Sequence, residues 1–144
     1  MKSIAETLGA RGEAWLGAPG IAEEQLQELV RKFPELPAEY LELLRVNNGG
    51  EGELNLPPRW FQLYDAQTVM EIASMEITEL HPGFIFFGSN GGLETIAFNI
   101  RGTAPWPVVM LDTVAGPDSA VQIAQSVGEF IQAIGVAFHD AAQQ

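Results

Sequence analysis

The glycine-rich segment GSNGG at residues 88–92 lies between two apolar runs and constrains the fold more than any other stretch of the chain. The run FIFF (84–87) precedes it, and ETIAFNI (94–100) follows it. Asn90-Gly91 is a favoured hairpin dipeptide, because both central residues of a type I′ turn need positive φ. The pattern therefore predicts a strand, a tight turn and a second strand.

A glycine-rich loop can also bind phosphate, and a ligand loop is the alternative interpretation of this segment. A phosphate-binding P-loop needs a lysine and a hydroxyl after its glycines, whereas here Gly92 is followed by Leu-Glu-Thr, and the carboxylate of Glu94 would repel an anion. A dinucleotide fingerprint needs a parallel crossover unit, and none surrounds the segment. A nucleophile elbow needs glycine two residues before the serine, but Phe87 precedes Ser89 at that distance. The turn is the favoured interpretation.

Helical patterns flank this strand-rich middle of the chain. Ser3 and Glu6 have the S-x-x-E spacing of a capping box, and Ser126 and Glu129 repeat it near the C-terminus, where the apolar spacing predicts a helix that runs through Gly135. Further helices are expected over 21–33, from 37 to the Asn-Asn-Gly-Gly stop at 47–50, and near 66–75; further strands are expected over 52–56, 107–112 and 121–124.

The composition limits the classes of function. The chain has 144 residues, no cysteine, and a formal net charge of -12 from 7 basic and 19 acidic residues. The charge would repel a nucleic-acid backbone, and the absence of cysteine excludes disulfides, a zinc ribbon and a thiol nucleophile. No apolar run reaches the roughly 18 residues of a membrane span. We expect a soluble, cytoplasmic protein of one domain, with neither nucleic acid nor membrane as a partner. The charge itself indicates solubility first, and a basic protein partner second.

The two histidines do not indicate a metal site. His81 and His139 are far apart in sequence and lack the i, i+3 or i, i+4 spacing of helical zinc ligands. Surface positions are expected for both. The sequence predicts no catalytic residue, no metal and no cofactor.

Acidic and aromatic residues gather between positions 51 and 65. Candidate partner contacts are Glu51, Glu53, Trp60, Tyr64 and Asp65, because an aromatic anchor with a polar rim is the usual composition of a protein hot spot. Packing in the core is the alternative for the aromatic side chains. Glu51 and Glu53 could also serve as the acid and base of a small hydrolase, which would need a separation of roughly 5–9 Å, although two such carboxylates are more often plain surface.

The order of these elements resembles the SUKH superfamily, which includes cell-wall-assembly regulators and many bacterial immunity proteins. The stretch LPAEYLELLRVNNGG (36–50) is similar to the first family motif, with its Leu-Pro, acidic-aromatic helix and Asn-Gly-Gly stop. The hairpin FFGSNGGLETIAFNI (86–100), the Pro-led strand PVVMLD (107–112) and the closing Ser-x-x-Glu-Phe helix at 126–130 follow in the same order. The resemblance extends from about residue 21 to the C-terminus.

The resemblance implies a single α+β domain over 1–144, with a mostly antiparallel sheet flanked by N-terminal and C-terminal helices and with residues 1–20 as an N-terminal extension. It also implies a protein-binding module and not an enzyme. The leading hypothesis is an immunity protein that neutralises a toxin of a contact-dependent or polymorphic toxin system, with a basic, nuclease-type toxin as the candidate partner. The alternatives are a regulatory adaptor that binds a cellular protein and, less favoured, the carboxylate-dependent hydrolase. The partner-binding surface varies between members, so the resemblance assigns no binding residues.

Overall fold

A computed structural model describes residues 3–54, 59–92 and 94–135 and shows an α+β domain, as the sequence predicts. The helices are α1 (Ile4–Gly9), α2 (Glu23–Lys32), α3 (Ala38–Val46), α4 (Ala66–Ala73), α5 (Glu76–Leu80) and α6 (Val127–Ala133), with short 3₁₀ helices η1 (Gly12–Ala14) and η2 (Pro117–Ser119). The strands are β1 (Trp15–Gly17), β2 (Gly50–Glu53), β3 (Trp60–Leu63), β4 (Phe84–Ser89), β5 (Glu94–Asn99), β6 (Val108–Asp112) and β7 (Val121–Ala124).

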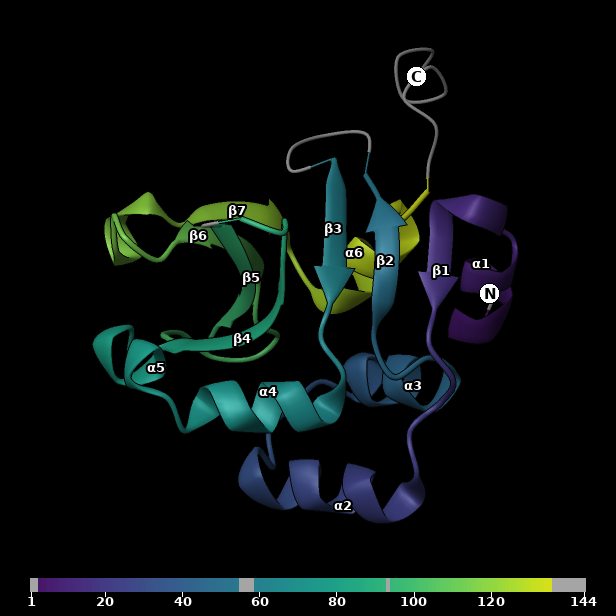
Figure 1. Ribbon diagram of the computed structural model, residues 1–144, viewed down its shortest axis with the longest axis horizontal. Coiled ribbons are helices and arrows are strands. Elements are labelled where there is room, and N and C mark those ends of the chain that lie inside the picture. The colour runs from purple at the N-terminus through teal and green to yellow at the C-terminus, as the bar shows by residue number, and fades with distance from the viewer. Residues whose placement is uncertain (1–2, 55–58, 93, 136–144) are drawn as a thin grey trace.

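The seven strands form one sheet in chain order, and every neighbouring pair is antiparallel. Strands β1–β3 stand side by side, whereas β4–β7 curl into a C-shaped half (Figure 1). The change of direction falls where β3 pairs with β4 only through Gln62–Ser89 and Leu63–Gly88. A bulge between Phe86 and Gly88 adds to it, because an extra residue bends the strand that carries it.

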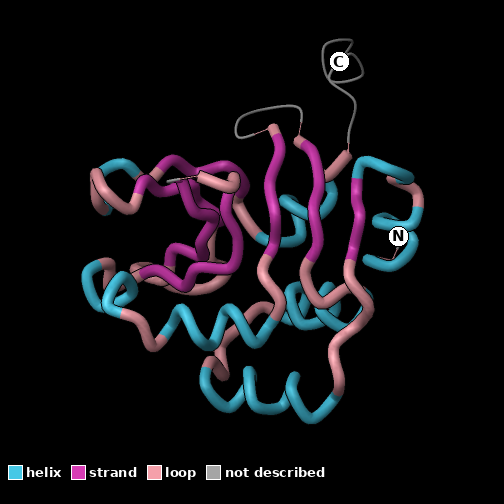
Figure 2. The backbone as a smooth tube through the Cα atoms, viewed as in Figure 1, coloured by secondary structure: helices cyan, strands magenta, loops and turns pink. Residues whose placement is uncertain are grey.

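Helices flank the sheet, and α4 runs along β4 beneath the curled half (Figure 2). At both predicted capping boxes the serine caps its helix: the Ser3 hydroxyl accepts the Glu6 N–H at 3.1 Å, and the Ser126 hydroxyl accepts the Glu129 N–H at 3.2 Å. The Glu129 carboxylate accepts the N–H of Gln125, the residue before the cap, at 3.3 Å. The prediction that Gly135 lies inside the last helix is wrong. Helix α6 ends at Ala133, Gly135 has a φ of 74°, and its N–H donates to the Glu53 carbonyl at 2.8 Å. Glycine takes this left-handed backbone without a steric penalty, so it ends the helix and ties it to β2.

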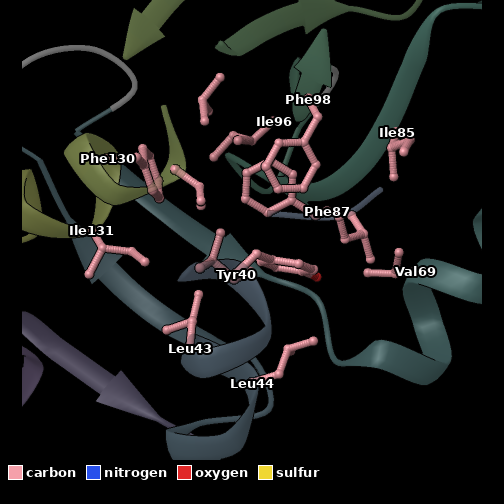
Figure 3. Close-up of a cluster of buried hydrophobic side chains, with 14 of the residues drawn as sticks. Tyr40, Leu43, Leu44, Val69, Ile85, Phe87, Ile96, Phe98, Phe130 and Ile131 are labelled. Atoms are coloured by element: carbon pink, nitrogen blue, oxygen red, sulfur yellow. The ribbon is translucent and has the colours of Figure 1, made fainter. Parts of the chain in front are cut away.

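The main core lies between the sheet and the helices and is built around stacked aromatic rings. Phe87 and Phe98 lie over one another with centroids 4.2 Å apart (Figure 3). Tyr40 from α3 meets both edge-on, at 5.4 and 5.2 Å. Phe130 from α6 approaches Phe87 edge-on at 6.3 Å. Offset stacks and edge-to-face contacts are the favoured arrangements of aromatic pairs, so this cluster fixes both α3 and α6 on the sheet.

A second, smaller core fills the opposite face of β4–β6. It consists of Phe84, Phe86, Ala97, Val109 and Leu111. Its existence explains the sequence FIFF, since Ile85 and Phe87 enter the main core while Phe84 and Phe86 enter the second one. Helix α4 supplies both cores, with Val69 in the main core and Ile72 against the second.

The hairpin between β4 and β5 confirms the strand-turn-strand prediction but not the turn type. Gly91 has a φ of 86°, whereas Asn90 does not have a positive φ. The connection is longer than two residues, and the Asn90 N–H donates to the Glu94 carbonyl at 3.1 Å. The Asn90 side chain instead accepts the Gly92 N–H at 2.9 Å, which is the local side-chain-to-backbone bond that lets asparagine form a turn without left-handed backbone.

The Asn-Asn-Gly-Gly stop of α3 joins three elements. The Asn47 side chain accepts the indole N–H of Trp15 at 3.0 Å and donates to the Ala18 carbonyl at 2.8 Å. The Asn48 side chain accepts the Ala66 N–H at 2.8 Å, at the start of α4. This segment therefore does more than end a helix, because it holds β1 and α4 in place.

The Tyr40 hydroxyl is an expected source of instability. It is buried and has no hydrogen-bond partner among the described residues, and a buried hydroxyl without a partner costs about 1–3 kcal/mol. We expect Tyr40→Phe to raise the free energy of unfolding by ~1 kcal/mol at neutral pH. Urea denaturation followed by circular dichroism measures this change.

The same substitution should change the response to alkaline pH. Burial, and secondarily the negative charge of Asp65, raise the pKa of Tyr40 well above its ordinary value. Above about pH 10 the unfolded chain releases this proton while the folded chain keeps it, so stability falls by roughly 1.4 kcal/mol per pH unit from there upward. Tyr40→Phe should remove that loss, whereas Tyr64→Phe, at the only other tyrosine, should leave it in place. An unchanged alkaline slope in Tyr40→Phe would contradict the assignment.

Candidate protein-binding surface

The exposed face of β2 and β3 brings three of the predicted contact residues together. Glu51 and Glu53 are exposed on one side of β2, and Gly52 between them is buried. The strand register places Glu53 opposite Trp60 and Glu51 opposite Gln62. Because directly opposed residues of antiparallel strands share a face, all four lie on the side away from the main core.

Trp60 is the aromatic centre of this face. Its side chain is 41% exposed, while the next residue of β3, Phe61, is completely buried. The indole rests against the β4–β5 turn, since a Cβ placed on Gly91 would lie only 3.0 Å from the ring. The turn therefore contacts the six-membered ring of the indole, and the exposed part of the side chain is available to a partner.

Leu16 is a member of the face that sequence reasoning missed. It is 60% exposed and lies directly opposite Glu51, across the β1–β2 pair. The acidic–aromatic surface is defined here by Leu16, Glu51, Glu53, Trp60 and Gln62. It combines two exposed apolar side chains with two carboxylates, which is the composition of a hot spot with a polar rim.

Tyr64 and Asp65 lie beyond the other end of β3 from Trp60. Tyr64 is half-buried and packs against the main core. Asp65 is exposed, but its carboxylate accepts the Thr68 N–H at 2.8 Å and caps α4. The structure thus separates these two predicted residues from Glu51, Glu53 and Trp60, and gives Asp65 a role in helix capping.

The described residues contain no group of three or more His, Cys, Asp or Glu side chains that could hold a metal ion. The expectation that His81 lies on the surface is wrong: it is 4% exposed and its ring meets Phe86 edge-on at 6.1 Å, because the residues after α5 fold back over the second core. His139 lies outside the described residues. In the part of the chain described, no helix has the length and apolar character to cross a membrane.

Helices packed on an antiparallel seven-stranded sheet, with an acidic–aromatic surface left open on β1–β3, define an α+β domain that presents a sheet face to solvent. The model of the SMI1 / KNR4 family (SUKH-1) matches residues 20–133, and the chain therefore belongs to this family. The SUKH group includes immunity proteins and SMI1/KNR4-like regulators, and its domains are generally non-catalytic. No curated protein matches the chain.

Proposed function

We propose that this protein is a non-catalytic binding module, and that it acts in the cytoplasm as an immunity protein that neutralises a bacterial toxin of a contact-dependent or polymorphic toxin system. Membership of a family that includes immunity proteins supports the proposal. The acidic–aromatic surface is the observation that carries it, because an exposed tryptophan with carboxylates beside it suits a partner that is both apolar and basic.

The charge of the whole chain favours such a partner. A net charge of -12 attracts a basic protein over a distance and speeds its association, whereas the close contacts determine how long the complex lasts. A basic nuclease toxin fits this description. Trp60 would then serve as the anchor, with Leu16 beside it and with Glu51 and Glu53 paired to basic side chains of the toxin.

A regulatory role is the second candidate, because the matching family model is the one that describes SMI1 and KNR4. An adaptor of this kind would bind a cellular protein through the same surface. Immunity and adaptor roles differ in one observable respect, namely whether the protein rescues a cell from a particular toxin.

Co-expression is the decisive experiment. Each neighbouring gene that could encode a toxin is induced together with this protein, and surviving cells are counted with and without it. Rescue by one pair supports immunity. If this protein rescues cells from none of the toxic neighbours, the immunity proposal is overturned. The adaptor proposal is then tested by affinity capture.

Within a rescuing pair, Trp60→Ala should raise the dissociation constant at least tenfold, because central aromatic anchors contribute ~2 kcal/mol or more to binding. Leu80→Ala is the matched control, since Leu80 is 65% exposed but lies on α5. Titration calorimetry on both variants, with thermal melts to verify folding, measures the difference. Equal affinity of the two variants would remove Trp60 from the interface.

A further inference from the structure

A groove of about 660 Å³ opens between the C-terminal end of α2 and the connection from β5 to β6. Ile85 and Trp106 line it and are only 7% and 6% exposed, so its floor lies within the fold. Phe33, Ile100 and Ala104 form apolar walls. The volume is within the roughly 300–1,000 Å³ of small-molecule sites.

The groove is separate from the acidic–aromatic surface. Ile85 lies near the start of β4 and its side chain joins the main core, on the side of the sheet that the helices cover. Trp60 lies on the opposite face, against the turn at Gly91 that follows the end of β4. A ligand in the groove would therefore not compete directly with a protein bound at the acidic–aromatic surface.

One basic side chain lines this groove, and a second lies beside the cavity that adjoins it. Lys32 lines it, and its ammonium lies 5.9 Å from the centre of the Phe33 ring. Lys32 also lines an adjoining cavity of about 220 Å³ together with Phe84, and the Arg101 guanidinium lies 4.8 Å from the Phe84 ring centre. Within the groove, Lys32 is balanced by Glu35, so the excess of positive charge comes from Arg101 beside the adjoining cavity. In a chain with 7 basic residues against 19 acidic ones, this pair of basic side chains favours an anionic ligand.

We propose that this groove binds a small amphipathic carboxylate, with its apolar body against Ile85 and Trp106 and its carboxylate at the Lys32 ammonium. The buried floor favours a small molecule, because the apolar part of such a ligand can reach the floor between the apolar walls. A folded protein could reach the floor only with a projecting segment. Glu35, the acidic residue of the lining, is exposed at the rim. It restricts the anionic group to the Lys32 side of the opening.

Three probes with the same ten-carbon body and different head groups test the proposal. Decanoate, 1-decanol and decyltrimethylammonium are titrated separately into the full chain by calorimetry, below the concentrations at which they form micelles. Decanoate should bind about fivefold more tightly than decanol, since a solvent-accessible ion pair contributes up to ~1 kcal/mol. The cationic probe should bind most weakly.

Two variants locate the site and one serves as a control. Lys32→Gln should lower the affinity for decanoate to that for decanol, while Arg31→Gln, an exposed neighbour on α2 that does not line the groove, should leave the ratio unchanged. Ala104→Phe should weaken the binding of decanoate and decanol alike by occupying the groove, and its melting temperature establishes that it folds.

Equal binding of the three probes, or undiminished binding to Ala104→Phe, would overturn the proposal. Binding of a short acidic peptide with Leu and Phe side chains, without binding of decanoate, would overturn it too and make the groove a peptide site.

Discussion

Replacing Phe87 by alanine should lower the free energy of unfolding by about 4 kcal/mol, the usual cost of removing a fully buried phenylalanine. The Phe87 ring stacks on Phe98 at 4.2 Å and meets Tyr40 and Phe130 edge-on. Its loss would leave a cavity bounded by strand β5 and helices α3 and α6, which are themselves held in place by these rings. Since domains are stable by only ~5–15 kcal/mol in total, this loss would remove roughly a quarter to four-fifths of the free energy of unfolding.

Urea denaturation measures this loss. The dependence of the free energy of unfolding on urea concentration should be unchanged, because this slope reports the surface exposed on unfolding and therefore whether the folded state has kept its compactness. Phe33→Ala is the matched control, since Phe33 is only half-buried at the end of α2. Its loss should be less than half of that at Phe87. A similar loss at both positions would mean that the stacked rings are not the centre of the core.

Gly49→Ala is expected to cost about 3 kcal/mol, from backbone strain and close contact together. Gly49 has a φ of 91°, which side-chain-bearing residues rarely adopt. An added Cβ would lie 2.8 Å from the Leu63 carbonyl oxygen and 3.0 Å from the Asp65 nitrogen. Both atoms are backbone, so relief requires that the end of β3 move away from the loop after α3.

Gly9→Ala is the control for this prediction. Gly9 is the last residue of α1, and an added Cβ there meets nothing within 4 Å. A small gain, ~0.5 kcal/mol, is expected from the higher helix propensity of alanine. Thermal melts of the two variants should therefore shift in opposite directions, and a Gly49→Ala melt at or above that of the wild type would contradict the strain argument.

The elements that the sequence predicts are those with strong local signals. Capping serines mark the starts of α1 and α6, and apolar runs mark β4 to β7. Strand β1 has no such signal, because its three residues become a strand only by pairing with β2, as in Trp15 opposite Gly52. Helix α5 is five residues long and begins without a side-chain cap at Met75, so neither periodicity nor capping indicates it.

The candidate surface likewise contains residues that local sequence patterns predict and one residue that they do not. Glu51 and Glu53 share a face because of their i, i+2 spacing, and a strand at 60–63 leaves Trp60 available to join them. Leu16 could not be predicted, since its place depends on a strand pair that forms across 35 residues of sequence. Asp65 resembled a member of the rim, but its position just before α4 gave it a competing use as a helix cap.

The chain-order arrangement of the sheet has a consequence for how the protein is made. From β2 to β7, each strand pairs with the one synthesised immediately before it, so a growing chain can add strands in the order in which they leave the ribosome. Strand β1 must wait while helices α2 and α3 are made before its partner β2, and β3 must wait while α4 and α5 are made before its partner β4. During translation, the last completed strand therefore keeps an unpaired edge at two stages, after β1 and after β3.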